Sequence, residues 1–576
     1  EIQMLRPRDI EKIEYHDAPS GKYAKDKLVV NFITKQYRYG GYVQADGLQT
    51  IGYDHGDYNV ATNYVKGNNS YTVFAGANYS HVDGTETWNN ENYQFTQSLF
   101  DRESYSKNSY QNHQEYMQFR YQNQKGKRYW VGKFTLVNLS TPRNASSGFA
   151  KESTETDIFS NIRKKSLSPK IDLNANLPLS KNQTLTLGVH GKYSANSYHR
   201  LYQEQPFEAM TDEDENALSF QLSAIYNYFS QKHSLSVELF HYHDVWNADY
   251  SGNCELWQHL WKGESLAFFS YNFQASRRLS LKTRIGLDWL QYHLYGDNSF
   301  SQLSPRINTN VQYQLNKGML LWSFNFVNSN HGMDVINRAM IQVNSHMMEK
   351  GMPELKKSHD INTYLYYMGR FNRLSVSAIG QFRYNHHPVT DDYYLDEANG
   401  KIVKTYSNGG NAQYYSAILA LQYKLCKFAN LSGDIRYNHA EVKTTWSKHN
   451  NNLTGNLGLN MFMGDFALKP YLHFGKKSLD EAALVISKTP IDYGMSCSYS
   501  RGNLYVELQA VSPFKKQEKR YWLDLPIYSY CKSIKDQTAS QYASIKVAYS
   551  FDFGRKTQKV EKDVNKNINS SLLRVE

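Results

Sequence analysis

Two histidines and two aspartates stand close together near residue 390, in the segment NHHPVTDD. They are His386, His387, Asp391 and Asp392. Imidazole nitrogens and carboxylate oxygens are ligands of transition metals, so this segment is a candidate metal site. The ordinary polarity of a surface loop accounts for the same four residues, and the sequence leaves the identity of any metal unknown.

A second group of possible ligands combines methionine with histidine. Thioether and imidazole groups can hold copper or haem iron. Packing of a loop by adaptable methionine side chains is the alternative. The consecutive members are His346, Met347 and Met348, and the same stretch contains Met333, Met340, Met352 and His359.

Trp246 is a third candidate for ligand binding. It follows His241, His243 and Asp244 near the end of an expected strand. An indole ring in this place can stack on a sugar ring. Anchoring at a membrane interface explains the residue equally well.

Motifs of common catalytic sites are missing from the sequence. It contains no GxSxG, no HExxH and no phosphate-binding loop. We therefore expect that the protein is not an enzyme and uses no cofactor. The net charge of +11 comes with no recognised nucleic-acid-binding module, so no nucleic-acid partner is expected.

The four cysteines do not form a recognisable framework. Cys254, Cys426, Cys497 and Cys531 show no CxxC spacing, which argues against a zinc site. They fall on separate strands and connections, so we expect four unpaired thiols.

The elements that position these residues follow from an alternation of apolar and polar side chains. In one example Leu504, Val506, Leu508 and Ala510 fall on one face of a strand and polar side chains fall on the other. The same pattern recurs along the chain. One face suits lipid and the other suits water, as in the wall of a transmembrane β-barrel.

Composition agrees with this interpretation but does not prove it. The mean hydropathy is -0.67, as expected when only every second residue of a strand meets lipid. The chain has 47 Tyr, 27 Phe and 9 Trp, and such rings suit the interfacial girdles of a barrel. A soluble, Tyr-rich β-protein that binds glycans is the alternative at this point.

The pattern predicts an all-β, antiparallel barrel of about 22 strands, an even number allowed for bacterial outer-membrane barrels. The expected strands are 38–50, 57–66, 70–82, 113–123, 128–139, 167–178, 183–196, 217–229, 234–246, 265–276, 279–293, 303–315, 319–329, 359–370, 374–387, 411–424, 431–443, 453–462, 466–475, 491–499, 503–511 and 541–553.

Short and long connections alternate along the predicted strands. The short ones are rich in turn-forming residues, and we expect them to face the periplasm. The long ones should be extracellular. A soluble sandwich has no reason to gather its long loops at one end, so this asymmetry favours the barrel. The long connections are 141–166, 198–216, 328–360, 388–410 and 512–540.

Residues 1–37 resemble the end of the plug domain of TonB-dependent outer-membrane receptors. In that family a strand of the type "I..IEV", a "GP.A.YG" turn and an "INIITK" strand precede the barrel. The matching segments are 10–15, 18–24 and 30–35. The usual Gly-Pro of the turn is Ala18-Pro19 here. The resemblance implies a remnant of an N-terminal plug domain.

Two later segments extend the resemblance. GMPELKK at 351–357 is similar to the "NP.LKPE" segment of these receptors, and YSFDFGRK at 549–556 resembles the closing strand of the outer-membrane barrels of Bacteroidota. We therefore divide the chain into the end of a plug (1–37), a barrel (38–553) and a charged periplasmic tail (554–576).

The resemblance implies a receptor and transporter in the bacterial outer membrane that imports a scarce extracellular ligand. Outer-membrane lipid, the TonB system and a surface lipoprotein or other outer-membrane protein would be its partners. The rest of the plug, a TonB box and a signal peptide are expected upstream of the first residue. The alternative is a barrel that transports nothing and scaffolds an outer-membrane secretion or assembly complex.

Overall fold

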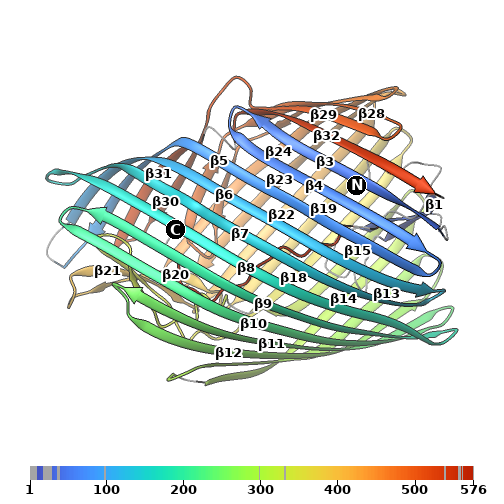
Figure 1. Cartoon of the computed structure of the whole chain (residues 1–576), viewed down its shortest axis with the longest axis horizontal. Coiled ribbons are helices and arrows are strands. Elements are labelled where there is room, and N and C mark those ends of the chain that lie inside the picture. The colour runs from blue at the N-terminus through green and yellow to red at the C-terminus, as the bar shows by residue number, and fades with distance from the viewer. Residues whose placement is uncertain are drawn as a thin grey trace.

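The computed structural model describes residues 10–16, 29–34, 39–96, 99–297, 299–329, 332–536, 540–554, 560 and 562–574. Within these residues the fold is all-β, and its main body is a closed antiparallel barrel of 22 strands (Figure 1). A search of the same residues for a helix long and apolar enough to cross a membrane finds none.

The strands of the wall differ widely in length. The first ten are β3 (Tyr39–Ile51), β4 (Asp54–Lys66), β5 (Asn69–Gln94), β6 (Leu99–Lys125), β7 (Arg128–Lys151), β8 (Glu155–Ser180), β9 (Gln183–Glu204), β10 (Phe207–Phe229), β11 (His233–Gly252) and β12 (Leu256–Gln274). The next eight are β13 (Leu279–Leu294), β14 (Ser299–Leu315), β15 (Gly318–Ser329), β18 (Ser358–Phe371), β19 (Leu374–His386), β22 (Asn411–Lys424), β23 (Ala429–Lys443) and β24 (Ser447–Met463).

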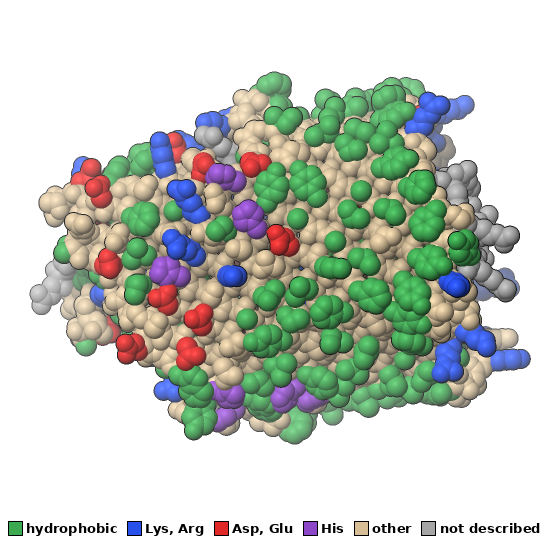
Figure 2. All heavy atoms as spheres, viewed as in Figure 1, with side chains coloured by type: hydrophobic (Ala, Val, Ile, Leu, Met, Phe, Trp, Pro, Cys, Tyr) green, Lys and Arg blue, Asp and Glu red, His purple; other side chains and the backbone are tan. Residues whose placement is uncertain are grey.

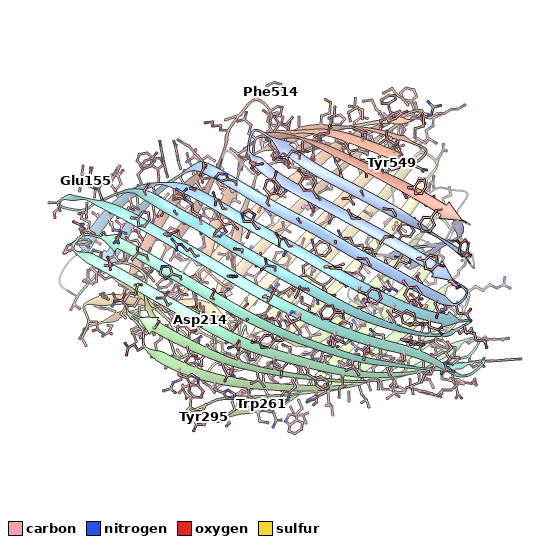
Figure 3. The ribbon with its side chains drawn as sticks, viewed as in Figure 1. Glu155, Asp214, Trp261, Tyr295, Phe514 and Tyr549 are labelled. Carbon is pink, nitrogen blue, oxygen red and sulfur yellow. The ribbon has the colours of Figure 1, made fainter. Side chains whose placement is uncertain are left out.

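The last four strands of the wall are each interrupted once. They are β25 (Phe466–His473) with β26 (Lys476–Asp480), β27 (Val485–Thr489) with β28 (Asp492–Arg501), β29 (Leu504–Val511) with β30 (Gln517–Asp524), and β31 (Tyr528–Asp536) with β32 (Tyr542–Gly554). Figure 3 shows Phe514, which is 88% exposed, on the connection between β29 and β30.

Two seams close the barrel. Strand β32 pairs with β3 from Gly40↔Gly554 to Ile51↔Ala543. The β3–β4 hairpin is short, and beyond its tip β31 pairs directly with β5, from Tyr528↔Tyr93 to Lys535↔Glu86. Pairing at both levels closes the wall, which is what a wall in lipid requires.

The expected inside-outside alternation is confirmed. On β29, Leu504 and Leu508 are 37% and 55% exposed, whereas Tyr505 between them is 4% exposed. The exposed side chains face away from the barrel, and Tyr549 on the neighbouring strand does the same (Figure 3). Apolar residues therefore face outward and buried polar residues face inward, as in a membrane barrel.

The outward apolar side chains form a band at the short-turn end of the barrel. On the face shown in Figure 2 they gather over that half of the surface. Acidic side chains and histidines lie mainly over the other half, and Lys and Arg occur there and along the short-turn edge. The tall strands β5–β9 continue well beyond the band, and Glu155 lies at the far tip of one of their hairpins (Figure 3). About ten tilted residues suffice to cross a bilayer, so these extensions project beyond the membrane.

All of the expected strands are present, but several are longer than predicted. The predicted loops 141–166, 198–216 and 512–540 are largely strand, and β6 begins at Leu99 instead of 113. The reason is that alternation marks only the part of a strand that has lipid on one side. Beyond the membrane both faces are polar, and the backbone ladder continues without that signal.

Strands β1 (Ile10–His16) and β2 (Val29–Thr34) form a separate antiparallel pair, with Ile13 opposite Phe32. These two strands coincide with the segments 10–15 and 30–35 that flank the plug-like turn. The turn itself, 18–24, lies outside the described residues. The assignment of 1–37 to the end of a plug stays a prediction.

A four-stranded sheet lies at the mouth of the barrel, at the end opposite the short turns. It consists of β16 (Met340–Gln342), β17 (Met347–Lys350), β21 (Lys401–Ser407) and β20 (Thr390–Asp396), in that order. We call it the mouth sheet. Its strands come from the two long connections 332–357 and 388–410, which are folded against the wall.

The described residues of the C-terminal tail pack against the inner wall of the barrel. Val560, Val564 and Ile568 pack against buried wall residues such as Phe74 and Tyr116. Leu572 and Leu573 are 2% exposed and pack with Ile162, Tyr198 and Ile341. The C-terminus consequently lies at the mouth end, far from the tip of β32 (Figure 1). The described part of the tail thus lies in the lumen.

A charge placed in the outer band should destabilise the barrel. Ile285 on β13 is 49% exposed and faces outward, so Ile285→Arg should cost about 2–4 kcal/mol of unfolding free energy if it lies near the bilayer centre. Urea titration of barrels folded into lipid vesicles measures this cost. Leu99→Arg, at the far end of β6, is the control and should cost far less. Equal costs would mean that the band does not lie in lipid.

Candidate functional site

The mouth sheet contacts wall strands that lie far apart around the barrel. Met347, Tyr393 and Ile402 from the sheet pack in one cluster with residues of the wall. The wall residues of this cluster are Tyr93 from β5, Ala412 from β22, Val442 from β23, Leu523 from β30 and Tyr528 from β31. The sheet therefore stretches across the mouth of the lumen.

A buried arginine organises the contact between the sheet and the tall side of the wall. The Arg102 guanidinium is 3.0 Å from a Glu91 carboxylate oxygen and 2.9 Å from one of Glu204. The other Glu204 oxygen accepts a hydrogen bond of 3.1 Å from the Ser345 hydroxyl in the β16–β17 turn. Arg102 is 4% exposed, so these bonds are charge-assisted and dry.

His346 belongs to the same contact. Its Nε2 lies 2.9 Å from a Glu152 carboxylate oxygen at the tip of the β7–β8 hairpin. Its ring packs against Phe100 at 4.5 Å between centroids, and against Tyr93 at 5.4 Å. The imidazole is thus used to attach the β16–β17 turn to the wall.

Met347 and Met348 lie on opposite faces of β17. Met347 is 6% exposed and packs in the cluster with Tyr393 and Ile402. Met348 is partly exposed. The surroundings of the Met347 thioether are aromatic and aliphatic, which is the packing role that the sequence left open beside metal binding.

Asp391 is part of an ion network inside the mouth sheet. The Lys404 ammonium lies 3.2 Å from Glu349 and 3.4 Å from Asp391, and the Tyr406 hydroxyl donates to Glu349 at 2.9 Å. Burial raises the pKa of Asp391 to about 6, and Lys404 opposes this shift. The network joins β17, β20 and β21 across their side chains.

Asp392 points to a different neighbour. It accepts hydrogen bonds from the Trp446 indole at 2.8 Å and from the Thr445 hydroxyl at 3.1 Å, both in the β23–β24 connection. These bonds attach β20 to the wall at β23 and β24, across the mouth from the tall strands β5–β9. Its carboxylate is therefore already used.

His386 and His387 lie apart from the two aspartates. Their rings are in contact, with centroids 3.9 Å apart, and His386 is exposed. Burial lowers the pKa of His387, and the neighbouring His386 lowers it further. Among the described residues no group of three or more His, Cys, Asp and Glu side chains could hold a metal ion. The segment NHHPVTDD is thus not gathered into one centre.

Trp246 faces inward and is 3% exposed. It packs with Leu260, Tyr292 and Met333 between the wall and the 332–357 connection. Its position is neither that of an interfacial anchor nor that of an open platform for a sugar ring. The four cysteines are free thiols, as the sequence predicted.

Several residues that position the site carry no recognisable motif. Asp288 on β13 is fully buried and lies 2.9 Å from the Lys357 ammonium, which is also fully buried. Arg306 also pairs with Asp288. Lys357 ends the GMPELKK segment, so this cluster anchors the return of the 332–357 connection. A charge at an inward position of the alternation is the only signal in the sequence that marks such residues.

No protein-family model matches this sequence, and no curated protein matches it significantly. Solved structures match it in fold. The copper transporter OprC is 10% identical, with a TM-score of 0.64 over 92% of this chain and 83% of that chain. The FrpB iron transporter from Neisseria meningitidis is 8% identical, with a TM-score of 0.57 over 95% and 88%.

A mutant ferric enterobactin receptor from Pseudomonas aeruginosa, in complex with enterobactin, is 11% identical, with a TM-score of 0.61 over 91% and 83% of the two chains. These proteins are TonB-dependent receptors. The fold of this chain is therefore the one that the plug-like segment and the 22-strand pattern predicted.

Loss of the buried arginine should loosen the mouth sheet. Arg102→Met leaves Glu91 and Glu204 buried without their cation, at a cost on the order of 3–5 kcal/mol. Hydrogen exchange of the backbone over 340–350, measured by mass spectrometry, should accelerate. Arg128→Met, at the exposed β6–β7 turn, is the control and should leave it unchanged. Slow exchange in both variants would contradict the assigned role of Arg102.

The mouth sheet should be more stable in mild acid. Asp391 has an ordinary pKa of 3.8 and a folded-state pKa of about 6, so between these values the folded chain holds a proton that the unfolded chain has lost. Stability is therefore present at low pH and is lost as the pH rises through about 6. Hydrogen exchange over 390–407 should show greater protection at about pH 5 than at about pH 7, after correction for intrinsic rates.

Asp391→Asn should remove this dependence, because the amide does not titrate, while Lys404 keeps Glu349 as a partner. Glu397→Gln, in the exposed β20–β21 turn, is the matched control and should keep it. Protection that grows with pH in the unmodified chain would refute the prediction.

Proposed function

We propose that this chain forms the barrel of an outer-membrane receptor that binds a scarce extracellular ligand at its mouth and passes it along its lumen. The observation that carries the proposal is the mouth sheet. It is built from two connections that fold across the opening, and side-chain bonds to Glu204, Glu152 and Trp446 attach it to the wall. Such a closure can part without breaking the barrel ladder.

The size of the barrel supports passage of a ligand. A wall of 22 strands encloses a lumen that must be filled by other parts of the protein, unlike the side-chain-filled interior of an eight-stranded barrel. Here the mouth sheet fills one end. Polar inward residues, including Asp288 and Arg306, line the wall below it.

The solved structures that share this fold suggest a ligand that is, or contains, a metal ion. The solved structures that share this fold include a copper transporter, an iron transporter and a ferric enterobactin receptor. We infer that the long-connection end is extracellular and the short turns are periplasmic. TonB would supply energy through a segment upstream of the first residue, and a surface lipoprotein or another outer-membrane protein would assist capture.

Among the sequence candidates, His386 and His387 are the best placed to touch a ligand at the mouth. His386 is exposed at the mouth end of β19, and its ring lies against His387. His346, Met347, Asp391, Asp392 and Trp246 are engaged in packing or bonding within the protein. Met348 is partly exposed on β17.

The test is to purify the native product from outer membranes in mild detergent and analyse it by native mass spectrometry. We expect a bound small molecule at one copy per barrel, together with an upstream segment that carries a complete plug. Loss of the small molecule in His386→Ala, with Tyr394→Ala as an exposed mouth control, would place its site. Stoichiometric protein partners without any small molecule would favour the scaffold alternative instead.

A further inference from the structure

The C-terminal segment follows the inner wall along most of the length of the lumen. We call residues 560 and 562–574 the strap. Its contacts begin at Tyr42 on β3 and end at Tyr250 on β11, beside the mouth sheet. At about 3.3 Å per residue, an extended chain from 562 to 574 spans roughly 40 Å, more than the ~30 Å of a bilayer's hydrocarbon core.

Side chains of the wall form hydrogen bonds with the backbone of the strap. The carbonyl oxygens of every second residue from 563 to 571 accept a hydrogen bond, four from inward side chains of the wall and the last from Asn337 of the 332–357 connection. The bonds are Gln118 to 563 at 3.3 Å, Lys170 to 565 at 2.8 Å and to 567 at 2.7 Å, Asn196 to 569 at 3.4 Å, and Asn337 to 571 at 2.8 Å. A period of two residues is that of an extended chain.

The side chains of the strap alternate in the same way. Those at 563, 565, 567 and 569 are exposed to the lumen, whereas those at 562, 564, 566, 568 and 570 are partly buried against the wall. The wall-facing set places aliphatic residues and lysines in turn. Val564 and Ile568 enter the cluster of Phe74 and Val137, whereas the lysines find polar and aromatic partners.

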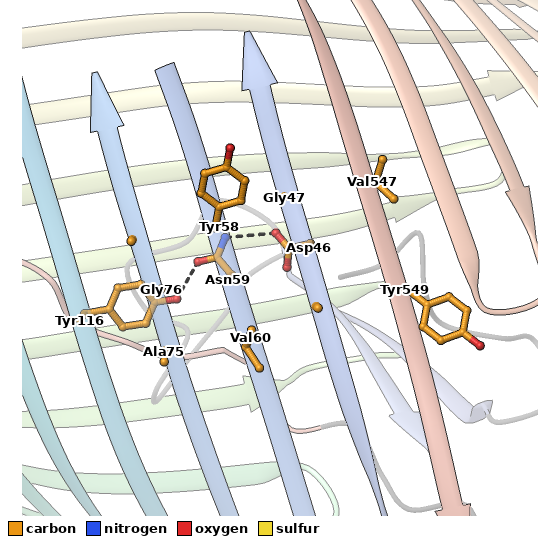
Figure 4. A pocket seen from close by; sticks show the side chains of 12 residues that line it. Asp46, Gly47, Tyr58, Asn59, Val60, Ala75, Gly76, Tyr116, Val547 and Tyr549 are labelled. Atoms are coloured by element: carbon orange, nitrogen blue, oxygen red, sulfur yellow. Dashed lines mark hydrogen bonds between the residues drawn. The ribbon is translucent and has the colours of Figure 1, made fainter. Parts of the chain in front are cut away.

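Both lysines of the strap contact Tyr116 or Asn59 on the wall. The Lys562 ammonium donates to the Asn59 amide oxygen at 2.7 Å, and the Lys566 ammonium lies 4.3 Å from the centre of the Tyr116 ring. The Tyr116 hydroxyl also donates to Asn59 at 2.7 Å, and the Asn59 amide donates to Asp46 at 3.1 Å (Figure 4). This arrangement combines a hydrogen bond, a cation–π contact and a nearby carboxylate.

The mouth end of the strap is bound most deeply. The backbone N–H and the hydroxyl of Ser571 donate to one Glu215 oxygen at 2.7 and 2.6 Å, and Glu215 is 1% exposed. The Leu573 N–H donates to the Tyr250 hydroxyl at 3.1 Å. A buried carboxylate without these donors would be costly, so the wall is built to hold a peptide here.

We propose that the inner wall from β3 to β11 is a binding track for an extended peptide, and that the strap is its resident ligand. The track recognises a peptide whose wall-facing positions alternate between aliphatic side chains and lysine, and it holds the backbone at every second carbonyl. This binding does not depend on the transport function proposed above. While the strap is seated, it occupies the path that a ligand would take.

The first test follows the strap in the full chain by pulsed electron spin resonance. Native cysteines are replaced by alanine, and spin labels are placed at Asn569→Cys, on the lumen side of the strap, and at Asn68→Cys in the exposed β4–β5 turn. A seated strap gives one narrow distance distribution. A broad distribution in the folded barrel, as from an unattached tail, overturns the proposal.

A wall variant tests whether the carbonyl contacts hold the strap. Lys170→Met nearly keeps the length of the side chain but removes two charge-assisted hydrogen bonds. The ratio of seated to released strap should therefore fall by about tenfold or more. Lys181→Met, in the exposed β8–β9 turn, is the control and should keep the narrow distribution. An unchanged distribution in Lys170→Met would overturn the track.

Competition by a separate peptide tests whether the track recognises the alternation of aliphatic residues and lysine. A synthetic peptide with the sequence of 560–574 is added in excess to the full, doubly labelled chain. It should displace the strap and broaden the distribution, whereas a peptide of the same composition in scrambled order should not. Displacement by both peptides, or by neither, would overturn the claim that the track selects an alternating sequence.

Discussion

The backbone hydrogen bonds of the wall are the constraint on which the rest of this structure depends. Lipid offers no partner to an amide or a carbonyl, so every strand at membrane level must be paired on both sides. Two seams satisfy that demand, one between β32 and β3 and one between β31 and β5. Once the ladder is closed, its outward side chains must suit lipid, and its inward side chains can only meet water or other parts of the chain.

Because inward side chains meet only water or other parts of the chain, the lumen contains many buried charges. Arg102 with Glu91 and Glu204, and Asp288 with Lys357, lie where a polar interior meets chain folded in from the mouth. Each group is paired, since an unpaired buried charge would cost several kcal/mol. The same physical need for partners holds the mouth sheet and the strap against the wall.

Alternation located part of each of the 22 wall strands because residues such as Leu504 and Leu508 meet lipid while Tyr505 does not. It missed the extensions of the tall strands, where both faces are polar. It could not distinguish a ligand from an anchor at His346, since Glu152 is distant in sequence. Nothing near Lys562 in the sequence indicates its contact with Asn59, so the packing of the tail could not be predicted.

Unequal strand heights give the mouth sheet a direction of movement. Its two parent connections leave the wall only from the low strands β15, β18, β19 and β22, so these four ends act as a covalent hinge. On the tall side, wall side chains hold it: Glu204 accepts from Ser345, Arg200 donates to the Gln342 carbonyl, and Glu152 contacts His346. Displacement of the sheet would break these side-chain bonds and leave the four backbone connections intact. The gap would then lie along β5–β9.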